Sequence, residues 1–550
     1  MTRLFLGASA LALIATPALA HDPEFSEARL STHVRTMSAD WFEGRAPGTA
    51  GEDKTVAYLM GAFAAAGLQP GGDLRADGSR EWTQDVVLAR STMVDTPLVE
   101  MNIGGEDVML VQNEDVAVRA PINGEAQVEL QDVELVFVGY GTHAPERGWS
   151  DYKDQDLSGK VLVMLVNDPD FEGGEGDFGG PEMTYYGRWT YKYEEAARRG
   201  AAGVLVIHET VPASYPWGVV ANGNEQTFDI VREDPKAAHA GLEGWMHSDL
   251  AERIFAANGT SLEAVKAAAR RKDFQPMPLG TTIDATLLAR QEQIAAKNVV
   301  GVLPGSERAD EYVVFTAHHD HLGMVEDPAE EGDAVYNGAL DNATGTAALI
   351  EQARAFAEKG GAKRSLVFLA VGAEERGLLG SKYYAANPLY PLSRTVGVIN
   401  TDSLGVFGPA SDFSISGTAR LGLLDLMIEE GEALGRTFAP DPRPEAGGFF
   451  RSDHFPFAQV GVPAVSYRSG QQLTEGGAER ATELARDYVA NHYHQASDEW
   501  SADWRFDGIT SDMLFIHRVA TTLANGEDWP NWAEGSEFKA IRDASAAERD

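Results

Sequence analysis

The second half of the chain alternates short apolar runs with longer segments of helical periodicity. Apolar runs occupy 299–303, 312–317, 366–371, 396–401 and 464–467, and helical patterns occupy 345–358, 379–386, 421–434 and 511–524. Short apolar runs are typical of strands buried on both faces, and their alternation with helices favours a largely parallel sheet. We therefore predict an α/β fold with a mostly parallel or mixed sheet flanked by helices.

The first half has a different pattern. Residues 28–37 and 51–66 are helical, and the Gly/Pro-rich loop 44–48 separates them. From about residue 80 the pattern changes to short β-like runs, which include strands at 161–166 and 203–208 around a helix at 192–199, and 250–271 is helical again. This change indicates a β-rich unit in the first half of the chain. The predicted boundaries are 21–95 for a first segment, 96–289 for the β-rich unit, 290–530 for the main α/β part and 531–550 for a polar surface tail; the resemblance described below implies that the β-rich unit is an insert in the α/β domain.

Composition narrows the possible partners and chemistry. A chain of 550 residues suits more than one domain. With 45 Lys+Arg against 84 Asp+Glu, its net charge is −39, which argues against nucleic acid or an anionic membrane as the main partner. The absence of cysteine excludes disulfides, thiolate metal sites and cysteine nucleophiles. Any metal would have to be held by His, Asp and Glu.

The first twenty residues have the pattern of a secretory signal peptide. Arg3 precedes an apolar stretch at 4–15, and Ala-Leu-Ala stands at 18–20. That stretch is too short to span a bilayer, and no later segment reaches about 18 uninterrupted apolar residues. We expect cleavage after Ala20 and an exported protein, periplasmic or extracellular.

Acidic and histidine residues stand where the predicted strands of the second half end. They are His318 and Asp320 after 312–317, Asp341 before the helix at 345–358, Glu374 and Glu375 after 366–371, and Asp402 after 396–401. In an open α/β sheet, ligands bind in the crevice beyond the carboxyl ends of the strands. Carboxylates gathered there would repel one another unless a cation shared them. The pattern therefore predicts a divalent metal site at this edge of the sheet.

His318 and Asp320 lie two residues apart and so point to the same side of an extended chain. We interpret His318 as a metal ligand through one ring nitrogen. Asp320 would then accept the other ring N–H, or fix it from nearby, and so set the tautomer. A polar loop of solvated histidines is the alternative, and we interpret His319 and His321 as structural.

Glu374 and Glu375 are adjacent, so their side chains point to different sides of the chain. One can bind metal while the other faces the attacking water as a general base. The alternative is an exposed acidic pair. The strongly apolar run before Glu374 argues against that alternative.

Five segments, in order along the chain, resemble the successive motifs of the M28 family of zinc metallopeptidases. They are AHHDHLG at 317–323, DNATG at 341–345, EERGLLGS at 374–381, NTD at 400–402 and YHQASD at 493–498. NVVG at 298–301 and SDHFPF at 452–457 resemble the family as well, over roughly 295–500 in total. The family includes bacterial aminopeptidases and the glutamate carboxypeptidase II group.

This resemblance implies two Zn²⁺ ions and a role for each site residue. Asp341 would bridge the ions, His318 and Asp402 would bind one, Glu375 and His494 would bind the other, Glu374 would be the general base, Asp320 would orient His318, and Tyr493 would stabilise the developing oxyanion. Manganese or cobalt could also occupy such a set of N and O ligands, so the choice of zinc rests on the resemblance. The substrate would be a peptide.

Residues 136–206 are similar to the protease-associated domain, which is often inserted in such peptidases. This resemblance implies a role for the insert in substrate access. The leading hypothesis is an aminopeptidase that removes N-terminal residues. A carboxypeptidase or dipeptidase, for which Arg451 leaves room, a glutaminyl-cyclase-like enzyme with one zinc and a non-catalytic binding protein are the alternatives, and the sequence leaves the oligomeric state open.

Overall fold

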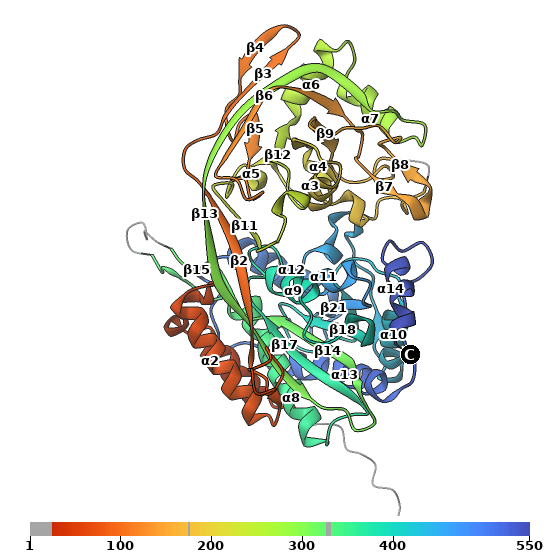
Figure 1. Cartoon of the computed structure of the whole chain (residues 1–550). Helices are drawn as coiled ribbons and strands as arrows, with labels where there is room; N and C mark the ends of the chain where they lie inside the picture. The colour runs from red at the N-terminus through yellow and green to blue at the C-terminus, as the bar shows by residue number, and fades with distance from the viewer. Residues whose placement is uncertain (1–24, 174–175, 326–331, 550) are drawn as a thin grey trace, which may run out of the picture.

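The computed structural model describes residues 25–173, 176–325 and 332–549, which form two lobes, one above the other (Figure 1). The expected signal peptide lies outside the described residues. Among the described helices, none has both the length and the apolar character needed to cross a bilayer.

The lower lobe is built on a mixed sheet. Its strands follow the order β11-β2-β13-β17-β14-β18-β21-β19-β20, with β1 beside the end of β13. The central pairs β17–β14–β18–β21 are parallel, and antiparallel pairs flank them. The bounds are β1 Gln69–Pro70, β2 Thr83–Met93, β11 Gln226–Ile230, β13 Met277–Leu303, β14 Arg308–His318, β17 Arg364–Val371, β18 Thr395–Thr401, β19 Asp412–Ile415, β20 Thr437–Phe438 and β21 Ala464–Ser469. The predicted α/β fold class is confirmed.

Helices cover both faces of this sheet, because its central strands are apolar on both faces. On β14, Val313 and Phe315 pack into the core that contains Phe356 of α8, whereas Val314 points to the opposite face, into the core that contains Tyr384 of α9. The bounds of the lower-lobe helices are α1 Glu27–Met37, α2 Ala50–Ala65, α8 Thr344–Glu358, α9 Leu379–Ala386, α10 Gly422–Ala433, α11 His454–Gln459, α12 Gly477–Asn491, α13 Phe506–Asn525 and α14 Lys539–Ser545.

The upper lobe is β-rich, as the sequence predicts for the insert. Its sheet has the order β4-β3-β13-β6-β9-β10-β12-β5, with α6 and α7 packed on one face and α3 on the other. The bounds are β3 Leu98–Ile103, β4 Glu106–Met109, β5 Val116–Val118, β6 Gln127–Phe137, β9 Val161–Leu165, β10 Gly203–His208, β12 Leu242–His247, α3 Trp189–Arg198, α4 Thr210–Ala213, α5 Trp217–Val220, α6 Ser248–Ala257 and α7 Leu262–Ala269. The short hairpin of β7 His143–Ala144 with β8 Trp149–Ser150 also belongs to this lobe. A second hairpin, β15 Gly323–Met324 with β16 Val335–Tyr336, lies beside Gly44 in the lower lobe. The protease-associated resemblance of this lobe stays a prediction.

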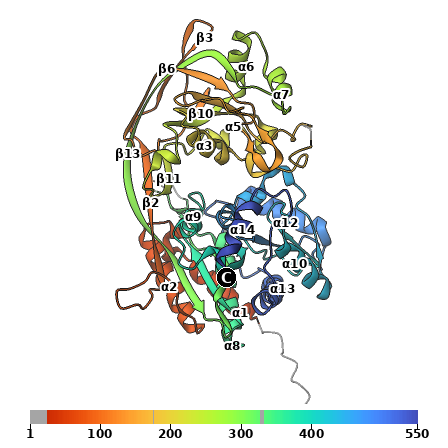
Figure 2. The same cartoon turned by 45° about the vertical axis from the view of Figure 1, so that its right-hand side comes forward.

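One strand belongs to both sheets. β13 pairs with β3 and β6 above and with β2 and β17 below, and it runs along one side of both lobes in both views (Figure 1, Figure 2). Its lower part, 289–299, pairs with β2 over the whole length of that strand. The two lobes are therefore joined by a continuous antiparallel ribbon.

The C-terminal segment differs from the expected polar surface tail. Trp532 and Phe538 are 3% and 5% exposed, and Phe449 packs against both rings. Charged residues lie between and after these two rings in the sequence, so the composition of the segment hides the two buried rings. The segment, which includes α14, is part of the lower lobe (Figure 1, Figure 2).

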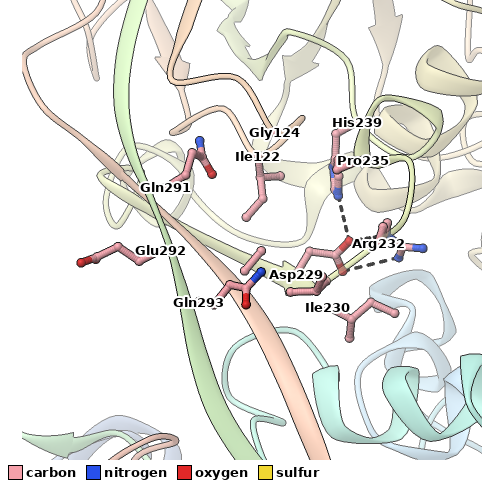
Figure 3. A pocket seen from close by; sticks show the side chains of 12 residues that line it. Ile122, Gly124, Asp229, Ile230, Arg232, Pro235, His239, Gln291, Glu292 and Gln293 are labelled. Atoms are coloured by element: carbon pink, nitrogen blue, oxygen red, sulfur yellow. Dashed lines mark hydrogen bonds and ion pairs between the residues drawn. The ribbon is translucent and has the colours of Figure 1, made fainter.

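A cluster of charges holds β11 to the lower lobe beside this ribbon. Asp229 on β11 is 2% exposed, and its carboxylate contacts Lys382 of α9 at 2.9 Å, Arg232 at 2.5 Å and His239 at 3.0 Å. It borders a cavity of about 300 Å³ (Figure 3), which none of the predicted site residues lines. Burial opposes ionisation of Asp229, but Lys382, His239 and Arg232 outweigh burial and hold its pKa well below the ordinary value.

Asp229→Asn should lower the free energy of unfolding by about 3 kcal/mol at neutral pH, because it leaves three cationic groups without their carboxylate. The folded-state pKa lies below the unfolded value of about 3.9, so this contribution is complete above that pH and is lost as the pH falls toward the folded-state pKa. Urea unfolding at pH 7 and at pH 3 measures it. The exposed control Asp95→Asn should have no effect, and an equal loss at both pH values would contradict the argument.

Candidate metal centre

The sheet topology brings the predicted site residues to one edge. His318 is the last residue of β14, Asp402 follows β18 directly, and Glu374 and Glu375 follow β17 by a few residues. These three strands are parallel neighbours, so their carboxyl ends meet. Asp341 stands just before α8 at the same edge, within reach of His318.

The first group of contacts surrounds His318. Its Nε2 atom lies 3.3 Å from Oδ1 of Asp341 and 3.3 Å from Oδ1 of Asp402. The His318 and Asp341 side chains are 1% and 6% exposed, and Asp402 is 21% exposed. The open side of this group therefore lies at Asp402.

The second group of contacts surrounds His494. Its Nε2 atom lies 3.4 Å from Oδ2 of Asp341 and 3.2 Å from Oε2 of Glu375. Asp341 thus turns one carboxylate oxygen toward His318 and the other toward His494. The sequence separates His494 from Asp341 by some 150 positions, and the fold places them in contact.

The spacing of these atoms suits zinc. Charge-assisted N–H···O bonds are typically about 2.7–2.9 Å long, so all four contacts are long for hydrogen bonds. Ligands held about 2.0–2.1 Å from a tetrahedral Zn²⁺ lie about 3.3–3.4 Å from one another, which is the edge of that tetrahedron. The distances between the histidines and the carboxylates therefore suit ligands that share a metal ion, and His318, Asp341 and Glu375 offer ligand atoms that all lie within 4.8 Å of one another.

Electrostatics favour cations at the same place. Burial lowers the pKa of His494, but Asp341 and Glu375 outweigh it and raise that pKa to about 10. Burial and Glu375 raise the pKa of Asp341, but its contacts with His318 and His494 outweigh them and lower that pKa to about 2. The neighbours of each group therefore stabilise its charged form. The carboxylates gathered here require positive charge nearby.

Glu374 has a different environment from Glu375. A carboxylate oxygen of Glu374 lies within 4.8 Å of ligand atoms of His318 and Asp402, whereas Glu375 falls in the corresponding group with His318 and Asp341. Burial raises the pKa of Glu374 well above its ordinary value; His318 opposes that rise, and Glu375 adds to it. The adjacent glutamates therefore share His318 as a neighbour but differ in their second carboxylate, which is Asp402 for Glu374 and Asp341 for Glu375.

Asp320 and Tyr493 lie beside the ligand groups. The Asp320 carboxylate lies 3.8 Å from Nδ1 of His318 and accepts the backbone N–H groups of Glu374 and Glu375, while its own carbonyl oxygen is the atom nearest Nδ1, at 3.3 Å. Tyr493 is 42% exposed, and its ring stacks on His494 with 3.9 Å between centroids. Asp320 thus links the loop after β14 to the loop after β17.

Three further side chains position the cluster, and sequence reasoning missed their roles. His321, interpreted as structural, contacts Oε1 of Glu375 through Nδ1 at 2.7 Å. Asp498 accepts the backbone N–H of Asp341 at 3.1 Å, and Ser452 donates its hydroxyl to Oδ2 of Asp402 at 2.7 Å. All three lie inside the motif segments, and that is the one indication the sequence offered.

Arg45 is a buried cation beneath the cluster. Its guanidinium donates to the carbonyl oxygens of Met37, His319 and Gly338, each at 2.9 Å, and it is 1% exposed. Burial lowers its pKa to about 10, although Asp320 and other cluster carboxylates oppose that decrease. Arg45 therefore ties the first helical segment to the loops that carry His318 and Asp341.

A cavity of about 560 Å³ lies between the lobes beside the cluster. The lower lobe contributes Glu375, Arg376 and the start of β11, and the upper lobe contributes Arg119 and Trp189; residues 223–225, which precede β11, complete the lining. A ligand that reaches the metal cluster through this cavity would contact both lobes.

The comparisons with known proteins agree with this site. Residues 298–515 match the model described as peptidase family M28. The aminopeptidase NAALADL1 of Mus musculus is 33% identical over 147 residues, which cover 25% of this chain and 18% of the relative. The leupeptin-inactivating enzyme 1 of Streptomyces exfoliatus is 33% identical over 161 residues, which cover 27% of this chain and 33% of the relative.

Among solved structures, the aminopeptidase from Aneurinibacillus sp. strain AM-1 is similar with a TM-score of 0.48 and 19% identity, over 92% of this chain and 95% of the other. The matched part of this chain spans about a fifth of the length of NAALADL1. The matched residues include all five motif segments and every predicted site residue. Residues 298–515 of the chain are therefore similar to peptidase family M28.

Proposed function

We propose that this protein is an exported zinc aminopeptidase with two metal ions, which hydrolyses N-terminal residues from peptides. The M28 match and the aminopeptidase relatives support the class of enzyme. The signal-peptide pattern of residues 1–20 supports export.

One observation carries the proposal of two ions. Asp341 presents its two carboxylate oxygens to two histidines on opposite sides, at 3.3 and 3.4 Å. Asp402 completes one side and Glu375 the other. A single ion would use one of these sides and leave the other carboxylate and histidine without a shared cation.

The chain's own residues account for the proton transfers. Two Zn²⁺ ions held by these ligands would lower the pKa of the attacking water and polarise the scissile carbonyl. Glu374 accepts the proton of that water on its carboxylate and later delivers it to the leaving amine. Its buried position, which raises its pKa, suits a group that must hold a proton between those two events.

The other residues orient and shield the reaction. Asp320 holds the backbone N–H groups of both glutamates, so it fixes the loop on which Glu374 stands. Tyr493 is partly exposed beside His494, where its hydroxyl can donate to the developing oxyanion. Residues of the upper lobe line the cavity beside Glu375, so a substrate that enters there would contact this lobe as well.

The proposed activity is tested with aminoacyl-p-nitroanilides and with N-blocked peptides, before and after treatment with a chelator. We expect hydrolysis of the substrates with a free amino end, loss of activity on chelation and recovery when two equivalents of Zn²⁺ are added back. Zinc titration should give an activity that saturates at two ions per chain.

Three outcomes would contradict the proposal. Cleavage of only the N-blocked set would favour a carboxypeptidase on the same scaffold. Full activity at one zinc per chain would contradict the second ion. Absence of hydrolysis with either set, in zinc-loaded protein, would favour a binding protein.

A further inference from the structure

The sheet of the lower lobe ends at β11, and one edge of that strand is unpaired. Within the described strands, β11 pairs with β2 alone, and β2 pairs with β13 on its other side (Figure 1). An unpaired edge is a row of backbone N–H and C=O groups that can bond to another extended chain. The free edge of β11 is therefore a place where such a chain can bind.

The ladder between β11 and β2 shows which backbone groups are free. Glu225 accepts the N–H of Met93 at 2.7 Å, and Val231 donates its own N–H to β2 at 3.0 Å. In an antiparallel pair every second residue bonds to the partner strand, so the N–H and C=O groups of Gln226 and Phe228 point to the free edge. Among the turn and loop hydrogen bonds of the described residues, none reaches these groups.

Both residues with free backbone groups line the cavity beside the metal cluster. This cavity of about 560 Å³ is bordered by residues 223–228 together with Glu375 and Arg376. The guanidinium of Arg376 lies 5.2 Å from the ring centroid of Phe228, so the loop that carries Glu375 packs against β11. Pockets that bind small ligands have volumes of about 300–1,000 Å³. A chain bound along β11 would therefore have one end beside a predicted metal ligand.

The upper lobe completes the lining with Arg119 and Trp189. Arg119 forms an ion pair with Glu243, and its guanidinium lies 4.7 Å from the ring centroid of Tyr193, so this cation already has an anionic partner. Trp189 offers an indole ring that can pack against an apolar side chain. The cavity therefore combines free backbone groups with an aromatic ring, which suits an extended peptide.

We propose that the peptide substrate binds in an extended conformation along the free edge of β11, with its N-terminal residue at the metal cluster. The proposal rests on the peptidase function proposed above and makes peptides of several residues, rather than dipeptides, the preferred substrates. Gln226 and Phe228 stand two residues apart, about 6.6 Å along a strand, so a peptide that pairs with both needs about three consecutive residues beside them. Main-chain hydrogen bonds supply the affinity in this mode of recognition, so the side chains of those residues can vary.

The test measures binding without turnover. Zinc-loaded full-length Glu374→Gln protein is titrated by calorimetry with Leu-Ala-Ala-Ala-Ala-Ala amide and with four derivatives, each methylated on the backbone nitrogen of one residue from the third to the sixth. A strand turns successive N–H groups to opposite sides, so methylation should weaken binding about fivefold to tenfold at alternate positions and leave it nearly unchanged at the others. Equal losses at all four positions, no loss at any, or absence of binding overturns the proposal.

A substitution in β11 tests the protein side. Gln226→Pro removes an outward N–H of an edge strand and no bond to β2, whereas the matched control Gln226→Ala changes the same side chain and keeps that N–H. In otherwise wild-type protein, Gln226→Pro should lower kcat/KM for the hexapeptide about fivefold to tenfold. It should keep kcat/KM for an aminoacyl-p-nitroanilide, which is too short to pair with β11, and Gln226→Ala should keep both.

The outcomes separate this proposal from the proposed function. A Gln226→Pro protein that hydrolyses the hexapeptide as well as the wild type does overturns the role of β11. If Gln226→Pro loses both activities, the methylation series decides by itself. A wild-type protein that hydrolyses neither substrate contradicts the proposed function, whereas the calorimetric series still shows whether a peptide binds along β11.

Discussion

Glu374→Gln should lower kcat by about a hundredfold to ten-thousandfold while the protein keeps its zinc, because an amide cannot accept the proton of the attacking water. The side chain stays the same size, and Glu374 is not one of the residues that contact His494 or the two oxygens of Asp341. Metal analysis by mass spectrometry and kcat on an aminoacyl-p-nitroanilide measure the two effects together.

The matched control is the neighbouring Glu375→Gln. Glu375 lies 3.2 Å from Nε2 of His494, so this change should weaken metal binding on that side and lower activity through metal loss. Excess zinc should then restore part of the activity of Glu375→Gln and none of that of Glu374→Gln. Metal loss in Glu374→Gln with full retention in Glu375→Gln would mean that the two roles are reversed.

Asp341→Ala should reduce bound zinc from two ions to less than one and remove measurable activity. Its carboxylate is the group that both histidines contact, at 3.3 and 3.4 Å, so its loss affects both sides of the cluster. Four ligands would then remain for two ions, two on each side, which is fewer than zinc sites in proteins ordinarily use. Equilibrium dialysis followed by metal analysis measures the stoichiometry.

Asp341→Asn and Asp425→Ala provide the comparison. An asparagine keeps one carbonyl oxygen, so it should hold at most one ion with useful affinity. Asp425 is exposed on α10, and its replacement should leave two ions bound. Two tightly bound ions in Asp341→Ala would contradict the bridging role.

The central strands of the fold could be predicted because burial on both faces requires a continuous run of apolar residues. On β14, Val313, Val314 and Phe315 are all apolar because successive residues face different cores. β13 could not be predicted in full: its long middle section faces solvent on one side and carries Arg290, Glu292 and Gln293, so only its last apolar residues read as a strand. The buried Trp532 and Phe538 were hidden in the same way by charged neighbours.

The ligand groups could be predicted because strand ends and acidic residues coincide in the sequence. Arg45 could not, since its partners are backbone carbonyl oxygens that no residue pattern reveals. The contact of His321 with Glu375 depends on how two loops meet, and the three histidines of residues 318–321 are equal candidates for it in the sequence.

The shared strand β13 also limits how far the two lobes can be treated as separate modules. A deletion of the upper lobe that also removed residues 289–303 would take away the partner with which β2 pairs along its full length. The edge of β17 next to it would then be open to pairing with other chains. If the upper lobe is replaced by that of a related protein, residues 83–93 and 289–303 should therefore be kept together in the lower lobe.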